Sequence, residues 1–288
     1  MKLFAPAKIN WTLEVGRRRD DGYHEVRTVM QTIDLCDELE LARDNGLRLE
    51  VVGPHEASED DLVMRAAALL DGDGGRGAHL RLTKRIPVAA GLGGGSSDAA
   101  AALRGLNEAW GLGHDEAELT GLAAQLGSDV SFFLSGGTAL AEGRGERVTP
   151  LPDAARAWLV VLAPPIALAD KTQRMYAALT PSDFADGSRT EALAERLRAG
   201  MPIRDGDLYN AFERAASAVF EGLDGYREAL LAAGASRVHL AGAGPALFAL
   251  AADEPGADAI RDKVSLPAGG RVFVVRTLTA AESLRREG

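Results

Sequence analysis

The sequence predicts a two-domain α+β protein. Its 288 residues exceed the usual size of one domain, and the hydrophobic fraction of 46% is ordinary for a globular chain. Apolar and polar residues partly alternate over 2–15, as in a strand, and a glycine-rich loop at 91–95 precedes an alanine-rich helix. After Pro150-Leu151-Pro152 the expected order is strand, helices, strand, strand, helix, strand, the split βαβ pattern. We therefore expect domains at 1–152 and 153–288.

The first domain is expected to begin with strands. After the first strand, the charged segment 16–24 is predicted to be a loop because it also contains glycine. Apolar and alternating runs predict further strands at 26–35, 39–41, 47–51 and 80–82. Ser58-x-x-Asp61 is typical of a capping box and predicts a helix to about Leu70. The glycine-rich segment 72–77 then connects this helix to the next strand.

Residues 91–98 read Gly-Leu-Gly-Gly-Gly-Ser-Ser-Asp and are the most informative stretch. Glycine disfavours regular structure, whereas the alanine run that follows favours a helix. We expect Ser96, Ser97 and Asp98 to cap the first free N–H groups of this helix. Its apolar residues recur on one face, at Leu103, Leu106 and Trp110. A flexible turn is the alternative, but four glycines beside hydroxyls at a helix N-terminus favour a phosphate site.

The remaining elements follow from the same signals. A helix is expected over 115–126, ended by Gly127, and a short apolar helix follows Asp129, which by itself could simply cap it. Glycines indicate a hairpin within 136–150. The second domain is predicted to contain strands at 158–162, 238–241, 246–251 and 271–278, helices at 190–199, 208–220, 226–233 and 256–264, and a mobile surface loop at 182–190.

Composition excludes several classes of function. The net charge of −10 disfavours general nucleic-acid binding, and the basic run at 17–19 is interpreted as a solvated loop. Cys36 is the only cysteine, which excludes an internal disulfide and a cysteine-rich zinc site and favours a packing role. We find no signal-peptide pattern or membrane-length apolar run, so we expect a cytoplasmic protein with no membrane partner. The oligomeric state is left open.

The glycine loop fits none of the commonest nucleotide motifs. No lysine follows it as in a P-loop, the dinucleotide fingerprint is only half matched, and the H-R-D and D-F-G landmarks are absent. Residues 87–100 instead resemble the ATP loop of the GHMP small-molecule kinases. Pro6-Ala7-Lys8-Ile9-Asn10 and Asp21-Gly22-Tyr23-His24-Glu25 are similar to the branch of that family whose substrate is a methylerythritol carrying cytidine diphosphate, in the non-mevalonate isoprenoid route.

This resemblance implies a fold and a reaction. The fold is a ribosomal-protein-S5-domain-2-like ATP domain followed by a ferredoxin-like domain, and the reaction is ATP-dependent phosphorylation of the 2-hydroxyl of the sugar alcohol. The family pattern makes Asp129 the general base and Lys8 the charge that supports it. ATP would enter with Mg²⁺, with the loop serines as candidate contacts and no assigned protein metal ligand. The implied ATP-binding residues are Pro87, Val88, Ala89, Ala90, Gly91, Leu92, Gly93, Gly94, Gly95, Ser96 and Ser97.

The resemblance also implies a substrate pocket, made of Asn10, Tyr23, His24, Tyr176, Gly242 and Gly244. An aromatic face can stack on a base, and histidine can hydrogen-bond its edge; packing roles for Tyr23 and Tyr176 are the alternative. The chain departs from the family pattern at Ser131, where proline is usual, at Ala241 and Ala243, where serines are usual, and at Lys171 and Arg174, where apolar residues are expected. Another GHMP kinase, of the homoserine or mevalonate type, and a non-catalytic nucleotide-binding regulator remain as alternatives.

Overall fold

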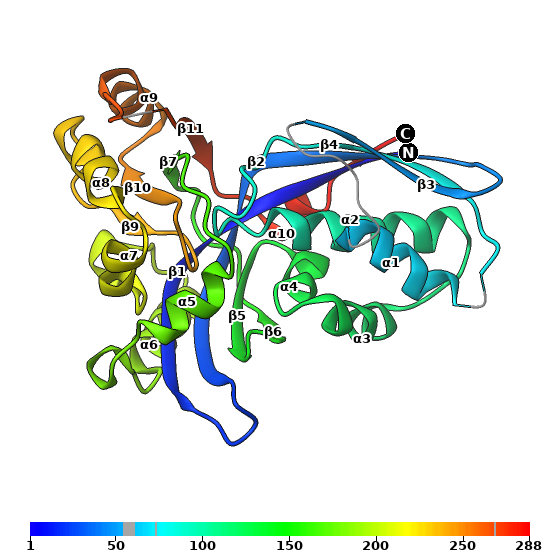
Figure 1. Cartoon of the computed structure of the whole chain (residues 1–288), viewed down its shortest axis with the longest axis horizontal. Helices are drawn as coiled ribbons and strands as arrows, with labels where there is room; N and C mark the ends of the chain where they lie inside the picture. The colour runs from blue at the N-terminus through cyan, green and yellow to red at the C-terminus, as the bar shows by residue number, and fades with distance from the viewer. Residues whose placement is uncertain (54–60, 73, 268) are drawn as a thin grey trace.

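The computed structural model describes residues 1–53, 61–72, 74–267 and 269–288, which form two β-sheets and the helices packed on them (Figure 1). The first sheet has the order β12-β1-β2-β4-β3. In addition, β5 pairs with β2, β6 pairs with β5, and β8 pairs with β1. Its strands are β1 (Lys2–Arg18), β2 (His24–Ala42), β3 (Leu47–Val52), β4 (Ala78–Thr83), β5 (Thr138–Gly143), β6 (Arg147–Pro150), β8 (Tyr209–Asn210) and β12 (Arg286–Glu287).

The second sheet confirms the split βαβ prediction. Its order is β11-β7-β10-β9, and all its pairs are antiparallel. The strands are β7 (Trp158–Ala163), β9 (His239–Leu240), β10 (Leu247–Ala251) and β11 (Arg271–Arg276). The helices of the chain are α1 (Leu62–Asp71), α2 (Gly94–Ala109), α3 (Glu116–Leu126), α4 (Val130–Ser135), α5 (Lys171–Ala177), α6 (Ser188–Arg198), α7 (Glu213–Val219), α8 (Leu223–Ala232), α9 (Glu254–Lys263) and α10 (Ala280–Ser283), with 3₁₀ turns at Pro181–Asp183 and Asp205–Asp207.

The long hairpin of β1 and β2 runs through the middle of the molecule (Figure 1). The predicted loop at 16–24 is wrong in its extent, because Arg18 still pairs with His24 and only 19–23 turn. Charged residues do not end the ladder here since their side chains point to solvent. The two strands predicted at 26–35 and 39–41 are one strand, with a register shift opposite Pro6 and Ala7 that breaks the alternation.

Two predicted helix starts need correction. In α1 the cap is Asp61, whose carboxylate accepts from the Val63 N–H, whereas Ser58 lies outside the described residues. In α2 the helix begins before the expected caps: Gly93 is the N-cap in the left-handed region, with φ of 75°, and no side chain caps the helix. Ser96, Ser97 and Asp98 therefore lie within the helix, because glycine reaches the entry conformation unaided.

The expected mobile loop at 182–190 is instead tied to the first sheet and to α7. The Ala185 N–H donates to the Val15 carbonyl over 2.9 Å, and Arg214 donates to the buried Asp183 carboxylate. The helix predicted from 208 begins only at Glu213, since Tyr209–Asn210 pair with β1 as β8. Polar sequence alone does not reveal such long-range contacts.

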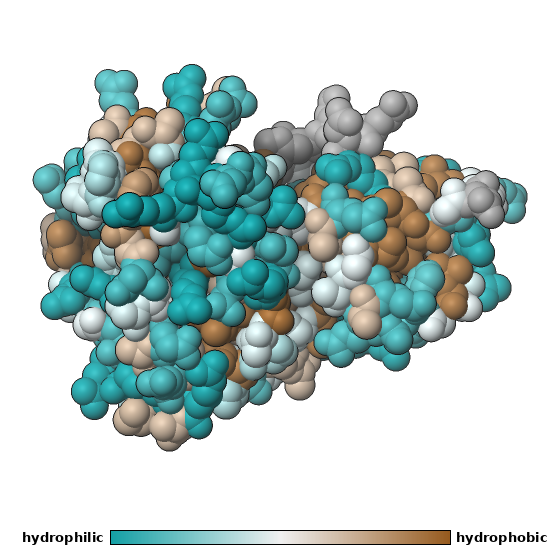
Figure 2. Space-filling view, turned by 90° about the horizontal axis from the view of Figure 1, so that it is seen from below, coloured by the Kyte–Doolittle hydropathy of each residue, from teal (hydrophilic) through white to brown (hydrophobic). Residues whose placement is uncertain are grey.

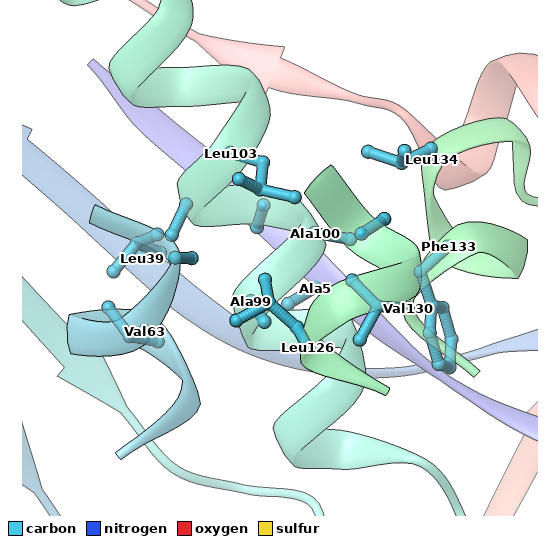
Figure 3. Close-up of a cluster of buried hydrophobic side chains, with 14 of the residues drawn as sticks. Ala5, Leu39, Val63, Ala99, Ala100, Leu103, Leu126, Val130, Phe133 and Leu134 are labelled. Atoms are coloured by element: carbon cyan, nitrogen blue, oxygen red, sulfur yellow. The ribbon is translucent and has the colours of Figure 1, made fainter. Parts of the chain in front are cut away.

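The alanines of α2 allow close packing of the N-terminal helices. Ala99 and Ala100 are fully buried, and side chains from α1, α3 and α4 gather around them on the sheet (Figure 3). A further cluster joins the two sheets, where Trp11 of β1 meets Phe248 of β10 edge to face with ring centroids 6.2 Å apart. On the face seen in Figure 2, hydrophilic residues predominate at the left, and apolar residues reach the surface mainly at the right, over the N-terminal helices.

The end of the chain returns to the first sheet. Lys2 of β1 pairs with Glu287 of β12, and the Gln31 side chain donates to the Leu278 carbonyl over 2.8 Å. The last residues of the chain thus pack on the N-terminal domain predicted at 1–152, and the division at 152/153 stays a prediction. Within the described ranges, no helix has the length and apolar character needed to cross a membrane.

Candidate active site

A cavity of about 1280 Å³ lies where the two halves of the chain meet. Its walls come from β1, the β1–β2 turn, the glycine loop, the α3–α4 connection, the β5–β6 turn, α5 and the loop between β9 and β10; representative lining residues are Lys8, Tyr23, Gly91, Asp129, Arg144, Lys171 and Gly242. Residues far apart in the sequence thus converge on one space.

Lys8 and Asp129 form the charged pair of this cavity. The Lys8 side chain is almost fully buried, and its Nζ lies 3.5 Å from Asp129 Oδ2. The backbone N–H of Lys8 donates to the Leu92 carbonyl over 2.9 Å, which fixes β1 against the glycine loop. Asp129 occupies the N-cap position of α4 but makes no capping hydrogen bond. The Asp129 side chain therefore does not cap the helix, and its carboxylate can contact a ligand.

Asn10 orients the lysine. Lys8 Nζ donates to Asn10 Oδ1 over 3.0 Å, and Asn10 Nδ2 donates to Thr28 Oγ1 over 2.7 Å. The Thr28 hydroxyl in turn donates to the Thr12 carbonyl. This chain fixes the amide orientation so that its oxygen, rather than its nitrogen, faces the ammonium group. No local pattern singles out Thr28, which reaches Asn10 only because β1 pairs with β2, where Thr28 stands opposite Leu13 and Asn10 opposite Met30.

The glycine loop needs glycine for close approach as well as for conformation. Gly91 has φ of 90°, and a Cβ there would lie 2.3 Å from the Ala241 carbonyl oxygen. A Cβ on Gly93 would meet Phe133 at 2.8 Å. All the predicted ATP-loop residues except Ser97 line the cavity. The Ser97 hydroxyl is buried and has no hydrogen-bond partner among the described residues.

A buried ion cluster supports the start of this loop. Lys84 Nζ lies 2.5 Å from Asp37 Oδ2 and also donates to Asp98. Asp37 Oδ1 accepts from the backbone N–H groups of Arg85 and Ile86, at 2.5 and 2.8 Å, so it anchors the chain just before the loop. Burial raises the pKa of the Asp98 carboxyl. Burial by itself would lower the pKa of Lys84, but the charges of Asp98 and Asp37 outweigh it, so the pKa of Lys84 is raised. No local sequence pattern indicates this cluster, because its members are far apart in the chain.

Aromatic side chains line a further part of the cavity, which we call the aromatic end. His24 and Tyr176 stack with ring centroids 5.3 Å apart, and the Arg144 guanidinium lies 4.9 Å from the Tyr23 ring centroid. Tyr23 is 55% exposed, so its outer face is open to a ligand. His24 Nδ1 donates to the Gly16 carbonyl over 2.9 Å, since that oxygen can only accept. Burial, followed by the charge of Asp129, raises the pKa of Tyr176 to about 12.

The late glycine loop, residues 240–245, packs against the first. A Cβ on Gly242 would lie 2.8 Å from the Gly91 carbonyl oxygen and 3.1 Å from Lys8 Nζ. Gly242 lines the cavity, whereas Gly244 lies behind it and contacts Gly91. Lys171, at a position where the family pattern led us to expect an apolar residue, donates to carbonyls of both loops. Across the described ranges, no group of three or more His, Cys, Asp and Glu side chains could hold a metal ion.

Comparison with known proteins agrees with this arrangement. Residues 61–137 match the family described as GHMP kinases N terminal domain, and residues 190–267 match GHMP kinases C terminal. A 4-diphosphocytidyl-2-C-methyl-D-erythritol kinase of Dehalococcoides mccartyi is 43% identical over 281 residues, covering 96% of this chain and 98% of the relative. The same kinase of Symbiobacterium thermophilum is 41% identical over 286 residues, covering 96% and 100%.

Solved structures show the same relationship. A crystal structure of a 4-(cytidine 5'-diphospho)-2C-methyl-D-erythritol kinase superposes with a TM-score of 0.78 at 36% identity, covering 96% of this chain and 99% of the other. A homoserine kinase from Cytophaga hutchinsonii superposes with a TM-score of 0.70 at 22% identity, covering 97% and 96%, which shows the shared fold alone. The chain is thus an ATP-using kinase, and it belongs to the 4-diphosphocytidyl-2-C-methyl-D-erythritol kinase family within the GHMP kinases.

Proposed function

We propose that this kinase transfers the γ-phosphoryl group of ATP to the 2-hydroxyl of 4-diphosphocytidyl-2-C-methyl-D-erythritol. The observation that carries the proposal is the Lys8–Asp129 pair, 3.5 Å apart, in one cavity that is lined both by the glycine loop and by Tyr23, His24 and Tyr176. The glycine loop suits a phosphate chain, and the aromatic side chains suit a nucleobase. The alcohol to be phosphorylated would lie between them, beside the pair.

Phosphoryl transfer depends mainly on positioning and on charge compensation. Asp129 would accept the proton of the attacking hydroxyl, and its partly open carboxylate leaves room for that contact. Lys8 would stabilise the alkoxide and the transferred group, because its ammonium is buried and held in place by Asn10. The glycine loop and the N-terminus of α2 would hold the ATP phosphates with backbone N–H groups.

Mg²⁺ would enter this site with ATP. It prefers oxygen ligands and usually takes only one or two protein carboxylates along with substrate phosphates and waters. The Ser96 side chain lines the cavity at the glycine loop, so its hydroxyl would supply one oxygen ligand beside the ATP phosphates and waters, and Asp129 would stay free to act as the base. When bound, the ion would neutralise phosphate charge.

Cytidine recognition would fall to the aromatic end. Because His24 Nδ1 carries the proton donated to Gly16, the Nε2 atom of a neutral ring is left as an acceptor. An acceptor suits the 4-amino group of cytosine, which is a donor. Tyr23 would supply a stacking face, which is worth about 1–3 kcal/mol per base. A homoserine or mevalonate substrate needs neither feature. The free Cys36 thiol fits the reducing cytoplasm in which we place the enzyme.

The test is ADP release with ATP, Mg²⁺ and one acceptor at a time: 4-diphosphocytidyl-2-C-methyl-D-erythritol, its uridine counterpart, homoserine or mevalonate. We expect turnover with the cytidine compound and a markedly lower kcat/KM with the uridine one. Turnover with homoserine or mevalonate alone would refute the substrate assignment. Tight ATP binding without turnover on any acceptor would instead favour a nucleotide-binding regulator.

A further inference from the structure

The two glycine loops meet along a seam that Lys171 closes. The Ala246 N–H donates to the Ala90 carbonyl over 2.9 Å, and Gly91 lies against Gly244. Lys171 is the first residue of α5, and its Nζ donates to the Ala89 carbonyl over 2.7 Å and to the Gly244 carbonyl over 2.6 Å. One ammonium group thus binds both loops directly.

The backbone on either side of this contact is strained. Within the described ranges, the non-glycine residues with positive φ are Ala89, at 55°, and Asp170, at 52°. Ala89 supplies a carbonyl to Lys171, and Asp170 directly precedes it. This conformation costs on the order of 1 kcal/mol per residue for a side chain larger than glycine, and such strain concentrates at functional sites. Strained backbone thus lies on both sides of the Lys171–Ala89 hydrogen bond.

The electrostatic surroundings of Lys171 are poor for a cation. Its two hydrogen-bond partners are neutral carbonyls, and the charged groups that act on it are Lys8 of β1, which repels it, and Asp129 before α4, which attracts it. Burial, then the repulsion from Lys8, lowers the pKa of Lys171 to about 8. Lysine has three N–H donors, and two are used here. The ammonium group consequently has one donor and an uncompensated charge left, at the wall of the ATP end of the cavity.

We propose that Lys171 binds an oxygen of the ATP phosphate chain with its third donor while the other two hold the glycine loops together. This inference rests on the proposed use of the glycine loop for ATP. An anionic oxygen supplies the charge that the carbonyls do not, so binding stabilises the protonated amine. ATP binding above pH 8 then requires uptake of a proton at Lys171, and the affinity for ATP falls as the pH rises through 8, by at most tenfold per pH unit.

The test is direct ATP binding by titration calorimetry from pH 7 to 9.5, without an acceptor, on the wild type and on K171M, K171R and R174M. At pH 7 we expect K171M to bind ATP roughly 10- to 100-fold more weakly, the cost of a charge-assisted hydrogen bond. K171R keeps its charge throughout, so its affinity should stay flat above pH 8 where that of the wild type declines. R174M, changed on the same helix but at an exposed residue outside the cavity lining, should match the wild type.

Two results would overturn the proposal. One is ATP affinity in K171M within threefold of the wild type at pH 7. The other is a pH-dependent decline in K171R equal to that of the wild type, which would leave Lys171 only its structural contacts. If circular dichroism shows that K171M does not fold, the K171R pH profile decides. Because no acceptor is present, this outcome is independent of which alcohol the wild type phosphorylates.

Discussion

Replacing Asp129 by asparagine separates proton transfer from shape. The exchange keeps the size of the side chain but removes its charge and its capacity to take a proton. The lost attraction to Lys8 at 3.5 Å amounts to about 1 to 5 kcal/mol, depending on whether water or protein dominates the dielectric. With the carboxylate 36% exposed, the lower end applies. Lys8 also keeps its hydrogen bond to Asn10, so D129N should fold normally.

We expect kcat of D129N to fall by roughly 10²- to 10⁴-fold, which is about 3 to 5.5 kcal/mol of transition-state stabilisation. The KM for ATP should stay equal or decrease, because Lys8 loses its anionic neighbour and is freer to attract phosphate. Steady-state ADP release at varied ATP and varied acceptor separates these quantities. The matched control is D115N: Asp115 caps α3, where asparagine serves equally well, so kcat should not change. A D129N enzyme with kcat within threefold of the wild type would refute the assignment of Asp129 as the base.

Three further experiments test the pocket, the loops and the cysteine. Tyr23 is exposed, so Y23A should leave stability and the KM for ATP unchanged while raising the KM for the cytidine substrate about tenfold, and Y23F should behave as the wild type in the same assay. G91A should lower the free energy of unfolding by roughly 1–3 kcal/mol in urea titrations and weaken ATP binding, because its Cβ would overlap the Ala241 carbonyl; G111A, also at positive φ but in open space, should cost only about 1 kcal/mol. Burial raises the pKa of Cys36 to about 12, so at pH 8 its thiol should react slowly with iodoacetamide when folded and rapidly in urea; equal rates would contradict this.

Much of the fold was accessible from local patterns. The strands at 47–51 and 158–162 and the helix at 115–126 were predicted within a residue or two, because each has a clear period and a stop signal. The errors concern segments whose structure depends on distant partners. The tie between 182–190 and Val15 is one example, and the pairing of Tyr209–Asn210 with β1 is another. No local propensity encodes either contact.

The candidate site divides in the same way. The family resemblance pointed to Lys8 and Asp129, and the structure brings them within 3.5 Å, although their roles stay a prediction. The buried partners were not predictable: Asp37 and Asp98 meet Lys84 only because β2, β4 and α2 converge below the glycine loop. In the sequence alone, nothing distinguishes these three residues from charged residues on the surface. Burial converts them into an anchor, since isolated charges in a core are costly and must pair.

Two departures from the family pattern lie at one place in the structure. The family pattern led us to expect serines at 241 and 243, but alanines stand there, so the late glycine loop lacks both hydroxyl donors. Ala241 is fully buried, and its carbonyl oxygen would lie 2.3 Å from a Cβ on Gly91, so the two loops are in close contact here. Lys171 supplies N–H donors at this seam, where its ammonium group donates to the carbonyls of Ala89 and Gly244. If the ammonium group replaces the lost hydroxyls as a phosphate contact, it introduces a titrating charge where a serine would be neutral. The pH dependence of ATP binding is therefore the property in which this chain should differ from relatives that keep the serines.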